Sequence, residues 1–547
     1  MDKLKTTRRK EQELEQLSPF ELKDNLIKLA ADKDKKPARA MLNAGRGNPN
    51  WIATIPREAF FLLGQFGVAE CRLPMEKPEG VAGIPQTKGI AKRFEAFLEK
   101  SRTQPGADLL KQLYEYGMKK HHFKADDWVH ELAEGIVGDQ YPDPVRMLKH
   151  SEAIVHDYLL QEMCAGSPPP GTFDLFAVEG GTAAMCYIFD SLVQNGLLKK
   201  GDKIALGVPV FTPYLEIPEL DRYRFKIVKV YASEKNENGA STFQYPEEEL
   251  DKLGDKSIKA FFVVNPSNPT SVAIGEKCKK YLEKVIKNLN PNLMILTDDV
   301  YGTFVEGFGS LMKDLPHNTL CVYSFSKYFG ATGWRLGVVA LHEHNIFDQM
   351  LTAVPQKEKE RLSKRYESLT LHPEKLKFID RLVADSRQIA LNHTAGLSTP
   401  QQMQMVLFAA FALLDQQNSY KKSCIELLHH RYKLLWEGMK MEIAPDPTRA
   451  CYYCEIDMKE WGIKNYGKEF IAYLEKNFEP VDIVFRLAEK SSVVLLNGGG
   501  FAGPEWSVRV SLANLNDESY YTIGKYLAET MQEYVDAWKQ SQARPTV

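Results

Sequence analysis

The sequence predicts an α/β fold, with a mostly parallel central sheet in a large domain and a smaller α+β domain. Between about residues 174 and 341, apolar runs typical of buried strands alternate with helical stretches. The runs are continuously apolar, which indicates that helices cover both faces of the sheet. They comprise Leu175–Val178, Ile204–Val208, Ala260–Val264, Met294–Thr297, Leu320–Tyr323 and Leu336–Ala340.

The length of 547 residues is too great for one compact core, so more than one domain is expected. We expect residues 1–140 to form an N-terminal arm and part of the small domain. Residues 141–395 are expected to form the large domain, and residues 396–547 the rest of the small domain. Lysine, arginine and glutamate are frequent at about residues 345–390, which indicates a charged helical insertion in the large domain.

The C-terminal part of the chain mixes helical and strand-like patterns, as an α+β domain requires. Helices are expected over residues 401–415 and 516–538, and strands around residues 452–456 and 507–511. Near the other end of the chain, Ser18 opens an amphipathic helix whose apolar spacing predicts a packing role without chemistry.

Composition excludes several classes of function. A formal net charge of −2 gives no electrostatic support for nucleic acid or membrane partners. No apolar run approaches the ~18 residues of a membrane span, and no hydrophobic segment follows the first charged residues, so we expect no secretory signal. The 8 cysteines are scattered, which fits a reducing cytoplasm. Cys451 and Cys454 lack a second ligand pair, so no metal site is expected.

The strongest chemical signal follows the strand expected at Leu320–Tyr323. Lys327 comes just after the strand end, with Ser324 before it and Arg335 after it. A partly desolvated lysine can lose its proton and attack carbonyl groups, while serine and arginine suit a phosphate. A lysine that forms an imine beside a phosphate site indicates pyridoxal 5'-phosphate. A surface lysine near a strand end is the alternative for the isolated motif.

Two further groups follow the first and second strands. Gly181 and Thr182 open a helix, where backbone N–H groups and the helix dipole favour an anion. Phe211 stands where an aromatic ring can stack on a flat heteroaromatic ring, although ordinary core packing is an alternative.

The third and fourth strands are followed by polar groups that suit the same ring. Asn268 can donate its amide to a phenolate oxygen, and a plain turn is the competing account. A buried Asp298 can pair with a pyridine nitrogen and keep it protonated, whereas a helix cap is the alternative. Tyr301 can share the phenolate with Asn268. All these groups follow strand ends, where ligands bind in parallel sheets.

This ordered set resembles the class I aminotransferase family, fold type I of the pyridoxal phosphate enzymes, which is aspartate aminotransferase-like. Further segments resemble the branch of this family that removes the β-carboxylate of aspartate. The resemblance runs from about Leu17 to Trp538. The resembling segments are Leu42–Asn50, Phe176–Tyr187, Pro209–Leu220, Ile295–Phe304, Tyr323–Ala340, Asn392–Gln402 and Ser511–Asn516.

The resemblance implies a role for each matching residue. Lys327 would form the imine with the cofactor and move protons, and Asp298 would pair with its ring nitrogen. Asn268 and Tyr301 would hold the phenolate oxygen, and Phe211 would stack on the ring. The expected phosphate ligands are Gly181, Thr182, Ser324, Arg335 and, from a partner subunit, Tyr141.

The substrate residues also come from the resemblance. Arg509 would clamp the substrate α-carboxylate, beside Asn268, and Arg46 would lie near the distal carboxylate, with Gly45 in the same loop. One departure concerns Gly499, where relatives can carry an arginine, so any contact of that arginine must be absent or replaced. A second departure, Ser271 in place of a glycine, is expected to be benign.

The implied activity is β-decarboxylation of L-aspartate to L-alanine and CO2, with side transamination of aspartate and 2-oxoglutarate. An aminotransferase for dicarboxylic or aromatic amino acids is the alternative. A regulator with an aminotransferase-like sensing domain would need a DNA-binding module, and the residues before Met41 show no helix-turn-helix pattern. The family implies amino acid and 2-oxo acid ligands and at least a homodimer, with a larger assembly of dimers expected.

Overall fold

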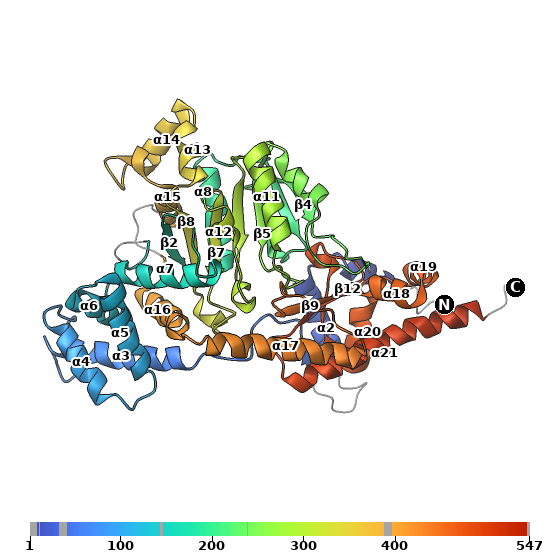
Figure 1. Cartoon of the computed structure of the whole chain (residues 1–547), viewed down its shortest axis with the longest axis horizontal. Helices are drawn as coiled ribbons and strands as arrows, with labels where there is room; N and C mark the ends of the chain where they lie inside the picture. Colours follow the sequence, from blue (N-terminus) through green and yellow to red (C-terminus); the bar gives the residue numbers. More distant parts are fainter. Residues whose placement is uncertain are drawn as a thin grey trace.

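The central feature of the structure is a seven-stranded sheet with the order β2-β8-β7-β6-β5-β3-β4 (Figure 1). The computed structural model describes residues 8–9, 11–31, 41–142, 146–237, 239–387 and 396–543. Only β8 runs antiparallel to its neighbours, β2 and β7, which confirms the predicted, mostly parallel α/β sheet. The strands are β2 Phe173–Val178, β3 Lys203–Val208, β4 Lys226–Tyr231, β5 Ile258–Val264, β6 Met294–Asp298, β7 Thr319–Ser324 and β8 Gly337–His342.

Every predicted strand of this sheet is present, and β4 is the strand that the sequence pattern missed. It pairs only with β3, at the sheet edge. Lys226 and Lys229 interrupt its apolar pattern, and Val230 is its one buried residue. Charged side chains are common on edge strands because they hinder pairing with another chain, and here they hide the strand signal.

Helices pack on this sheet and extend it into a helical cluster at one end of the molecule. Helix α8 packs on β7 and β8, and α7 packs on β2. Helices α3 to α6 pack together, in the blue region of Figure 1, and α3, α5 and α6 also pack against α16. The bounds are α3 Ile55–Arg72, α4 Ile90–Lys100, α5 Ala107–His121, α6 Ala125–Val137, α7 Lys149–Met163, α8 Gly181–Gln194, α9 Pro213–Glu216, α10 Glu247–Leu250, α11 Glu276–Leu289, α12 Leu311–Asp314 and α16 Thr399–Leu414.

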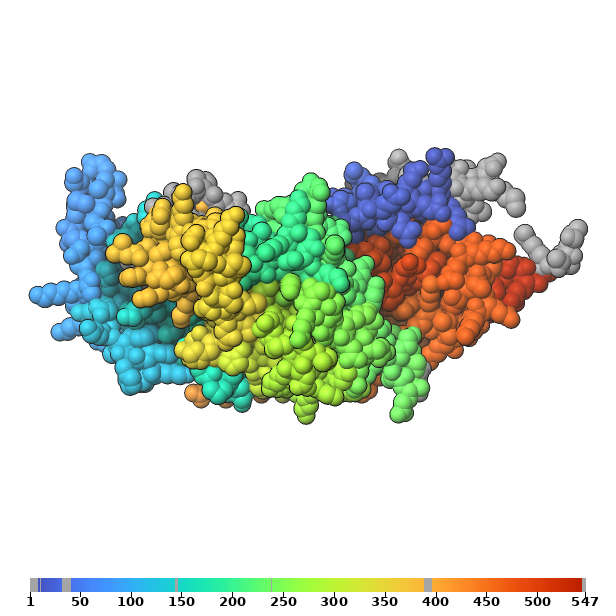
Figure 2. All heavy atoms as spheres, turned by 90° about the horizontal axis from the view of Figure 1, so that it is seen from above, coloured from blue at the N-terminus to red at the C-terminus, as the bar shows by residue number. Residues whose placement is uncertain are grey.

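The C-terminal elements form a second, smaller α+β unit around a three-stranded antiparallel sheet with the order β11-β12-β9. The N-terminal segment joins this unit, because α2 packs on α20 and β1 pairs with β10. Figure 2 shows the blue N-terminal segment lying against the orange and red C-terminal part. The bounds are α2 Pro19–Ala31, β1 Leu42–Asn43, α17 Ser419–Met439, β9 Tyr453–Asp457, α18 Met458–Tyr466, α19 Lys468–Asn477, α20 Asp482–Ser491, β10 Val493–Val494, β11 Leu496–Asn497, β12 Ser507–Ser511 and α21 Asp517–Gln542.

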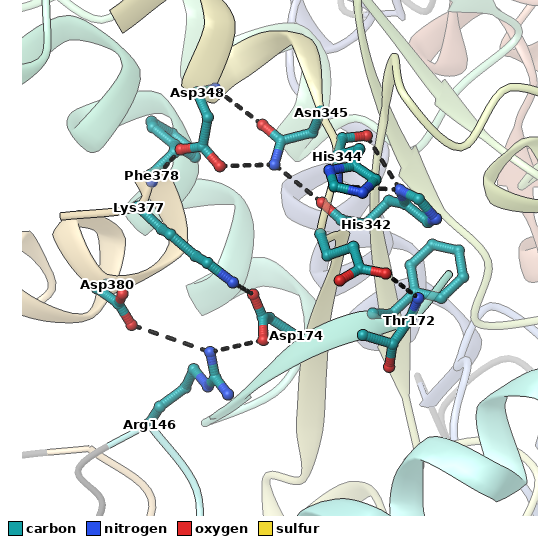
Figure 3. A network of polar contacts seen from close by, with 12 residues as sticks. Arg146, Thr172, Asp174, His342, His344, Asn345, Asp348, Lys377, Phe378 and Asp380 are labelled. Atoms are coloured by element: carbon teal, nitrogen blue, oxygen red, sulfur yellow. Dashed lines mark hydrogen bonds and ion pairs between the residues drawn. The ribbon is translucent and has the colours of Figure 1, made fainter. Parts of the chain in front are cut away.

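The charged segment after β8 contains α13 Ile346–Ala353, α14 Gln356–Tyr366 and α15 Phe378–Asp385. Ion pairs tie it to the large sheet (Figure 3). Lys377 Nζ lies 2.8 Å from Asp174 Oδ2 in β2. Arg146 Nη1, from outside the segment, links Oδ1 of the same carboxylate at 3.1 Å to Asp380 Oδ1 in α15 at 3.9 Å. Residues 388–395, which include the end of the expected insertion and part of one resembling segment, lie outside the described residues. Within the described ranges, no helix combines the length and apolarity needed to cross a membrane.

Helices α17 and α21 approach each other closely through two glycines. A Cβ added at Gly524 would lie 2.0 Å from the carbonyl oxygen of Leu435, and one at Gly438 would lie 2.1 Å from that of Tyr521. Because both obstacles are backbone atoms, no side-chain rotation can relieve either clash. The absence of side chains at these positions therefore sets the distance between the two helices.

We predict that Gly524→Ala destabilises the protein by at least about 2 kcal/mol, because the helices must separate to admit the methyl group. Gly64→Ala in α3 is the matched control, since its Cβ would meet nothing closer than Ile136 at 3.9 Å. That control should be neutral or stabilising, by up to about 1 kcal/mol, because alanine favours helices. Urea unfolding of both variants measures the difference, and equal free energies of unfolding would contradict the packing account.

Candidate active site

A cavity of about 340 Å³ lies between the ends of the large-sheet strands and the small sheet. It brings together most of the residues that the sequence singled out, from both ends of the chain. Its lining comprises Phe20, Gly47, Asn48, Gly181, Thr182, Phe211, Tyr214, Val264, Asn268, Asp298, Val300, Tyr301, Ser324, Ser326, Lys327, Thr332, Arg335, Tyr453 and Arg509.

The sheet topology explains this convergence. Strands β2, β3, β5, β6 and β7 run in the same direction, so their carboxyl ends meet at one edge of the sheet. Gly181 follows β2, Asn268 follows β5, and Asp298 is the last residue of β6. Groups that are far apart in the sequence therefore face one space because each follows a strand end.

One side of the cavity is a cradle for an anion. Gly181 is the first residue of α8, a helix of 14 residues, so the helix N-terminus points into the cavity. Gly180 has a φ of 94°, and a Cβ there would lie 2.6 Å from Arg335 Nη2. Arg335 donates from Nη1 to the carbonyl of Thr332 at 2.9 Å, and Ser324 Oγ lies 3.0 Å from Ser326 Oγ. Backbone amides, hydroxyls and a guanidinium group are the donors that a phosphate needs.

Asp298 is a buried residue of the cavity wall. The hydroxyl of Tyr214 donates to Asp298 Oδ2 at 2.6 Å, and Val300 N donates to Oδ1 at 3.3 Å. Burial raises the pKa of Asp298, while the Tyr214 hydroxyl, the Val300 amide and the charge of Lys327 act in the opposite direction. Tyr214 thus supports the ionised form of a carboxylate that burial would otherwise protonate.

Lys327 faces the cavity beneath the loop that follows β1. Its Nζ donates to the carbonyl of Gly47 at 3.3 Å, and the Tyr452 hydroxyl donates to the same oxygen at 2.8 Å. A Cβ at Gly47 would lie 2.6 Å from the Tyr453 hydroxyl and 3.6 Å from Lys327 Nζ. The missing side chain at Gly47 therefore lets the loop close over the lysine.

Arg509, from β12, is buried in the cavity wall. Its Nη1 donates to Asn268 Oδ1 at 3.2 Å and its Nη2 donates to the carbonyl of Gly45 at 2.9 Å. The guanidinium carbon lies 4.4 Å from the ring centroid of Tyr453. Burial lowers the pKa of Arg509, and its Nε has no hydrogen-bond partner in the described part of the chain. A buried cation whose hydrogen-bond acceptors are neutral suits an anionic ligand.

Tyr214, Tyr453 and Phe20 line the cavity but were not predicted as site residues. The signal for Tyr214 was its position three residues after Phe211, in the same loop. Tyr453 Oη lies 3.1 Å from Tyr301 Oη, and burial raises the pKa of Tyr301. Phe20 lies edge-on to Phe211, with 5.6 Å between ring centroids. The expectation that the helix after Ser18 has only a packing role is therefore incomplete, because Phe20 reaches the cavity.

Three predicted site residues do not line the cavity. Gly45 is buried and contributes its carbonyl to Arg509, whereas Arg46 beside it is exposed. Tyr141 is 75% exposed. Gly499 also lies outside the lining, and a Cβ there would meet Glu505 Cα at an ordinary 3.5 Å, so the backbone tolerates a side chain.

Comparisons with known proteins identify the class of protein to which this fold and this site belong. The family model described as aminotransferase class I and II matches residues 177–523, and the chain belongs to this family. A Pseudomonas protein named bifunctional aspartate aminotransferase and L-aspartate beta-decarboxylase is 48% identical over 527 residues, which cover 96% of this chain and 98% of the relative.

Solved structures share the fold at much lower sequence identity. The aromatic aminotransferase from Pyrococcus horikoshii OT3 has a TM-score of 0.55 at 17% identity, over 93% of this chain and 99% of that one. The aspartate aminotransferase from Thermus thermophilus has a TM-score of 0.51 at 17% identity, over 82% and 97% of the two chains. These structures support the aspartate aminotransferase-like fold.

We predict that Tyr214→Phe weakens the binding of pyridoxal 5'-phosphate, the cofactor proposed below for this cavity, because burial then raises the pKa of Asp298 without opposition from the hydroxyl. A hydrogen bond to a charged group contributes about 1.5–3 kcal/mol, which corresponds to about a 10- to 100-fold larger dissociation constant. Spectroscopic titration of the apoprotein measures this change.

The control is Tyr158→Phe, which removes another buried hydroxyl, 2.6 Å from that of Tyr323 and outside the cavity lining. It should alter stability while leaving cofactor affinity unchanged. Equal affinities in wild type and Tyr214→Phe would show that the Tyr214 hydroxyl does not support the carboxylate.

Proposed function

We propose that this chain is a pyridoxal 5'-phosphate-dependent enzyme that converts L-aspartate to L-alanine and CO2 and also transaminates aspartate. The buried pair of Tyr214 and Asp298 in the same cavity as Lys327 carries the proposal. The cavity residues fit the cofactor, since a carboxylate, an amine and an anion cradle stand at separate parts of its wall. The cradle is also free of any side chain at Gly180.

Different residues around the cavity would hold different groups of the cofactor. Asp298 would hold a proton at the ring nitrogen, while Asn268 and Tyr301 would donate to the phenolate oxygen. Phosphate would lie against the N-terminus of α8, with Ser324 and Arg335 as further donors. When bound, pyridoxal phosphate supplies an aldehyde that forms imines and a ring that withdraws electrons.

The chain's own groups then act on the amino acid. Arg509 would bind the α-carboxylate, with Asn268 beside it. The Nζ of Lys327 would remove the Cα proton of the amino acid and carry it. Arg46, with Gly45 in the same loop, is proposed to lie near the distal carboxylate when substrate is bound. Because Arg46 is exposed in this structure, that role requires movement of its side chain or of the loop.

Water exclusion would decide between the two outcomes. Loss of CO2 from the distal carboxylate competes with attack by water, which releases the substrate as a 2-oxo acid. A site that excludes water therefore favours alanine, and a site that admits water favours the 2-oxo acid. Phe20 supports exclusion because it lines the cavity and packs edge-on against Phe211. The 48% identity to the Pseudomonas protein favours decarboxylation over the alternative, an aminotransferase only, for dicarboxylic or aromatic amino acids.

We also propose that the active form is at least a homodimer, and that dimers assemble further. The exposed Tyr141 supports this, because its ring is available to reach the phosphate of a partner subunit. A cytoplasmic location is proposed as well, since all eight cysteines are free in the structure.

The proposal predicts sustained formation of CO2 and alanine when the holoenzyme is incubated with aspartate and no 2-oxo acid. Decarboxylation regenerates the starting enzyme, whereas transamination alone stops after one half-turnover. Release of CO2 and alanine per subunit measures the difference. Lys327→Ala is the control, because it removes the imine-forming amine and should abolish both products. A single half-turnover by the wild type would leave the aminotransferase alternative.

Two arginine variants should separate substrate binding from cofactor binding. Arg509→Ala should weaken aspartate binding by roughly 30-fold or more, because truncating one partner of a buried charge pair costs about 2–5 kcal/mol. Its cofactor affinity should stay near that of the wild type. Arg335→Ala should show the reverse, a loss of cofactor affinity through the phosphate. Loss of cofactor alone in Arg509→Ala would overturn the assignment to the α-carboxylate.

A further inference from the structure

A buried carboxyl group that has no role in the proposed chemistry lies next to Arg509. Glu455, in β9, is the direct cross-strand partner of Arg509 in β12. Directly opposed residues of an antiparallel pair point to the same face of the sheet, so both side chains lie on one face. Glu455 is only 5% exposed and Arg509 only 1% exposed.

Both side chains carry a buried polar atom without a partner. Glu455 Oε1 accepts from the hydroxyl of Ser507 at 2.8 Å, but Oε2 has no partner in the described ranges. The same is true of Arg509 Nε. A Cβ at Gly498 or at Gly503 would lie 2.6 Å from Glu455 Oε1, so the carboxyl is packed tightly by this glycine loop. An unpaired buried oxygen strongly favours the neutral acid over the carboxylate.

The surroundings of Glu455 favour its neutral state on balance. Burial has the largest effect and raises the pKa of Glu455 to about 8, and the charge of Asp457 acts in the same direction, while the Ser507 hydroxyl and the charge of Arg509 lower it. Cys454 is the neighbour on the same strand, and burial also raises its pKa. Gly498 and Gly503, which pack against the carboxyl, carry no charge. Near pH 7, Arg509 therefore has a neutral neighbour.

We propose that Glu455 is a positioning residue that leaves the charge of Arg509 available to a substrate carboxylate while it is protonated, and competes for that charge once ionised. The inference rests on the proposed role of Arg509 in binding the substrate. A second carboxylate beside the same cation disfavours ionisation of Glu455, so ligand binding raises its pKa further. Binding and protonation of Glu455 are therefore coupled.

The direction of the coupling gives two observable effects. Affinity for a carboxylate ligand should fall as the pH rises through about 8, because Glu455 must then regain a proton on binding. Binding near pH 8 should take up a proton, approaching about half a proton per site when the free group is half ionised. Between pH 8 and 9 the dissociation constant should rise by up to about fivefold.

Calorimetric titration of the holoenzyme with maleate, a dicarboxylate without an amino group, tests the inference. Titrations at pH 8 in buffers with different ionisation heats give the protons taken up, and absorbance follows the cofactor's own titration so that it can be subtracted. In Glu455→Gln, which mimics the protonated acid, the extra proton uptake and the rise in dissociation constant above pH 8 should disappear. At pH 6.5 this variant should bind maleate within about twofold of the wild type, since both side chains are neutral there.

Asp457→Asn is the matched control, because it removes a carboxylate from the same strand that accepts from the amides of Lys459 and Glu460. It should retain the proton uptake, with the midpoint at a lower pH because the charge that helps to raise the pKa of Glu455 is removed. Wild type with no uptake beyond that of the cofactor, or Glu455→Gln with unchanged uptake, would overturn the role of Glu455 and leave the proposed function intact. Absence of maleate binding at every pH would count against Arg509 itself and so against both proposals.

Discussion

The burial of one carboxyl group, that of Asp298, is the constraint on which the proposed chemistry of this protein depends. A carboxylate at the end of a central strand has lost most of its solvent, so it tends to become protonated. The Tyr214 hydroxyl, the Val300 amide and the charge of Lys327 each lower the pKa of Asp298 and so oppose that tendency. The cavity is thus organised around keeping a negative charge where water is excluded, which is the condition for holding a protonated ring nitrogen.

A second buried charge, that of Arg509, connects three distant parts of the chain. Its guanidinium group donates to the carbonyl of Gly45 in the N-terminal loop and to the amide oxygen of Asn268 after β5. The arginine itself lies in the C-terminal sheet. Correct folding of all three parts is therefore needed before the cation reaches the cavity. Its surroundings of tyrosine, phenylalanine and neutral oxygens leave the charge for an incoming anion, and Glu455 extends this arrangement to the neighbouring strand.

Much of the fold and of the cavity could be predicted because each signal is local. Continuous apolar runs identify the central strands, and polar groups just after them identify the residues of the cavity, as at Asn268, Asp298 and Lys327. The edge strand β4 was not predicted, because Lys226 and Lys229 interrupt its apolar pattern as loop residues do. Phe20 was not predicted as a cavity residue, because an amphipathic pattern does not indicate which partly exposed residue of a helix lines a cavity.

The sequence by itself determined the strand ends and the order of the polar groups along them. These depend on short-range spacing, which can be read directly. Only the tertiary structure decided that Tyr214 supports Asp298, that Tyr453 and Phe501 pack on Arg509, and that Glu455 faces the same arginine. Such contacts depend on strand register and on the packing of different segments against one another, which local patterns do not encode.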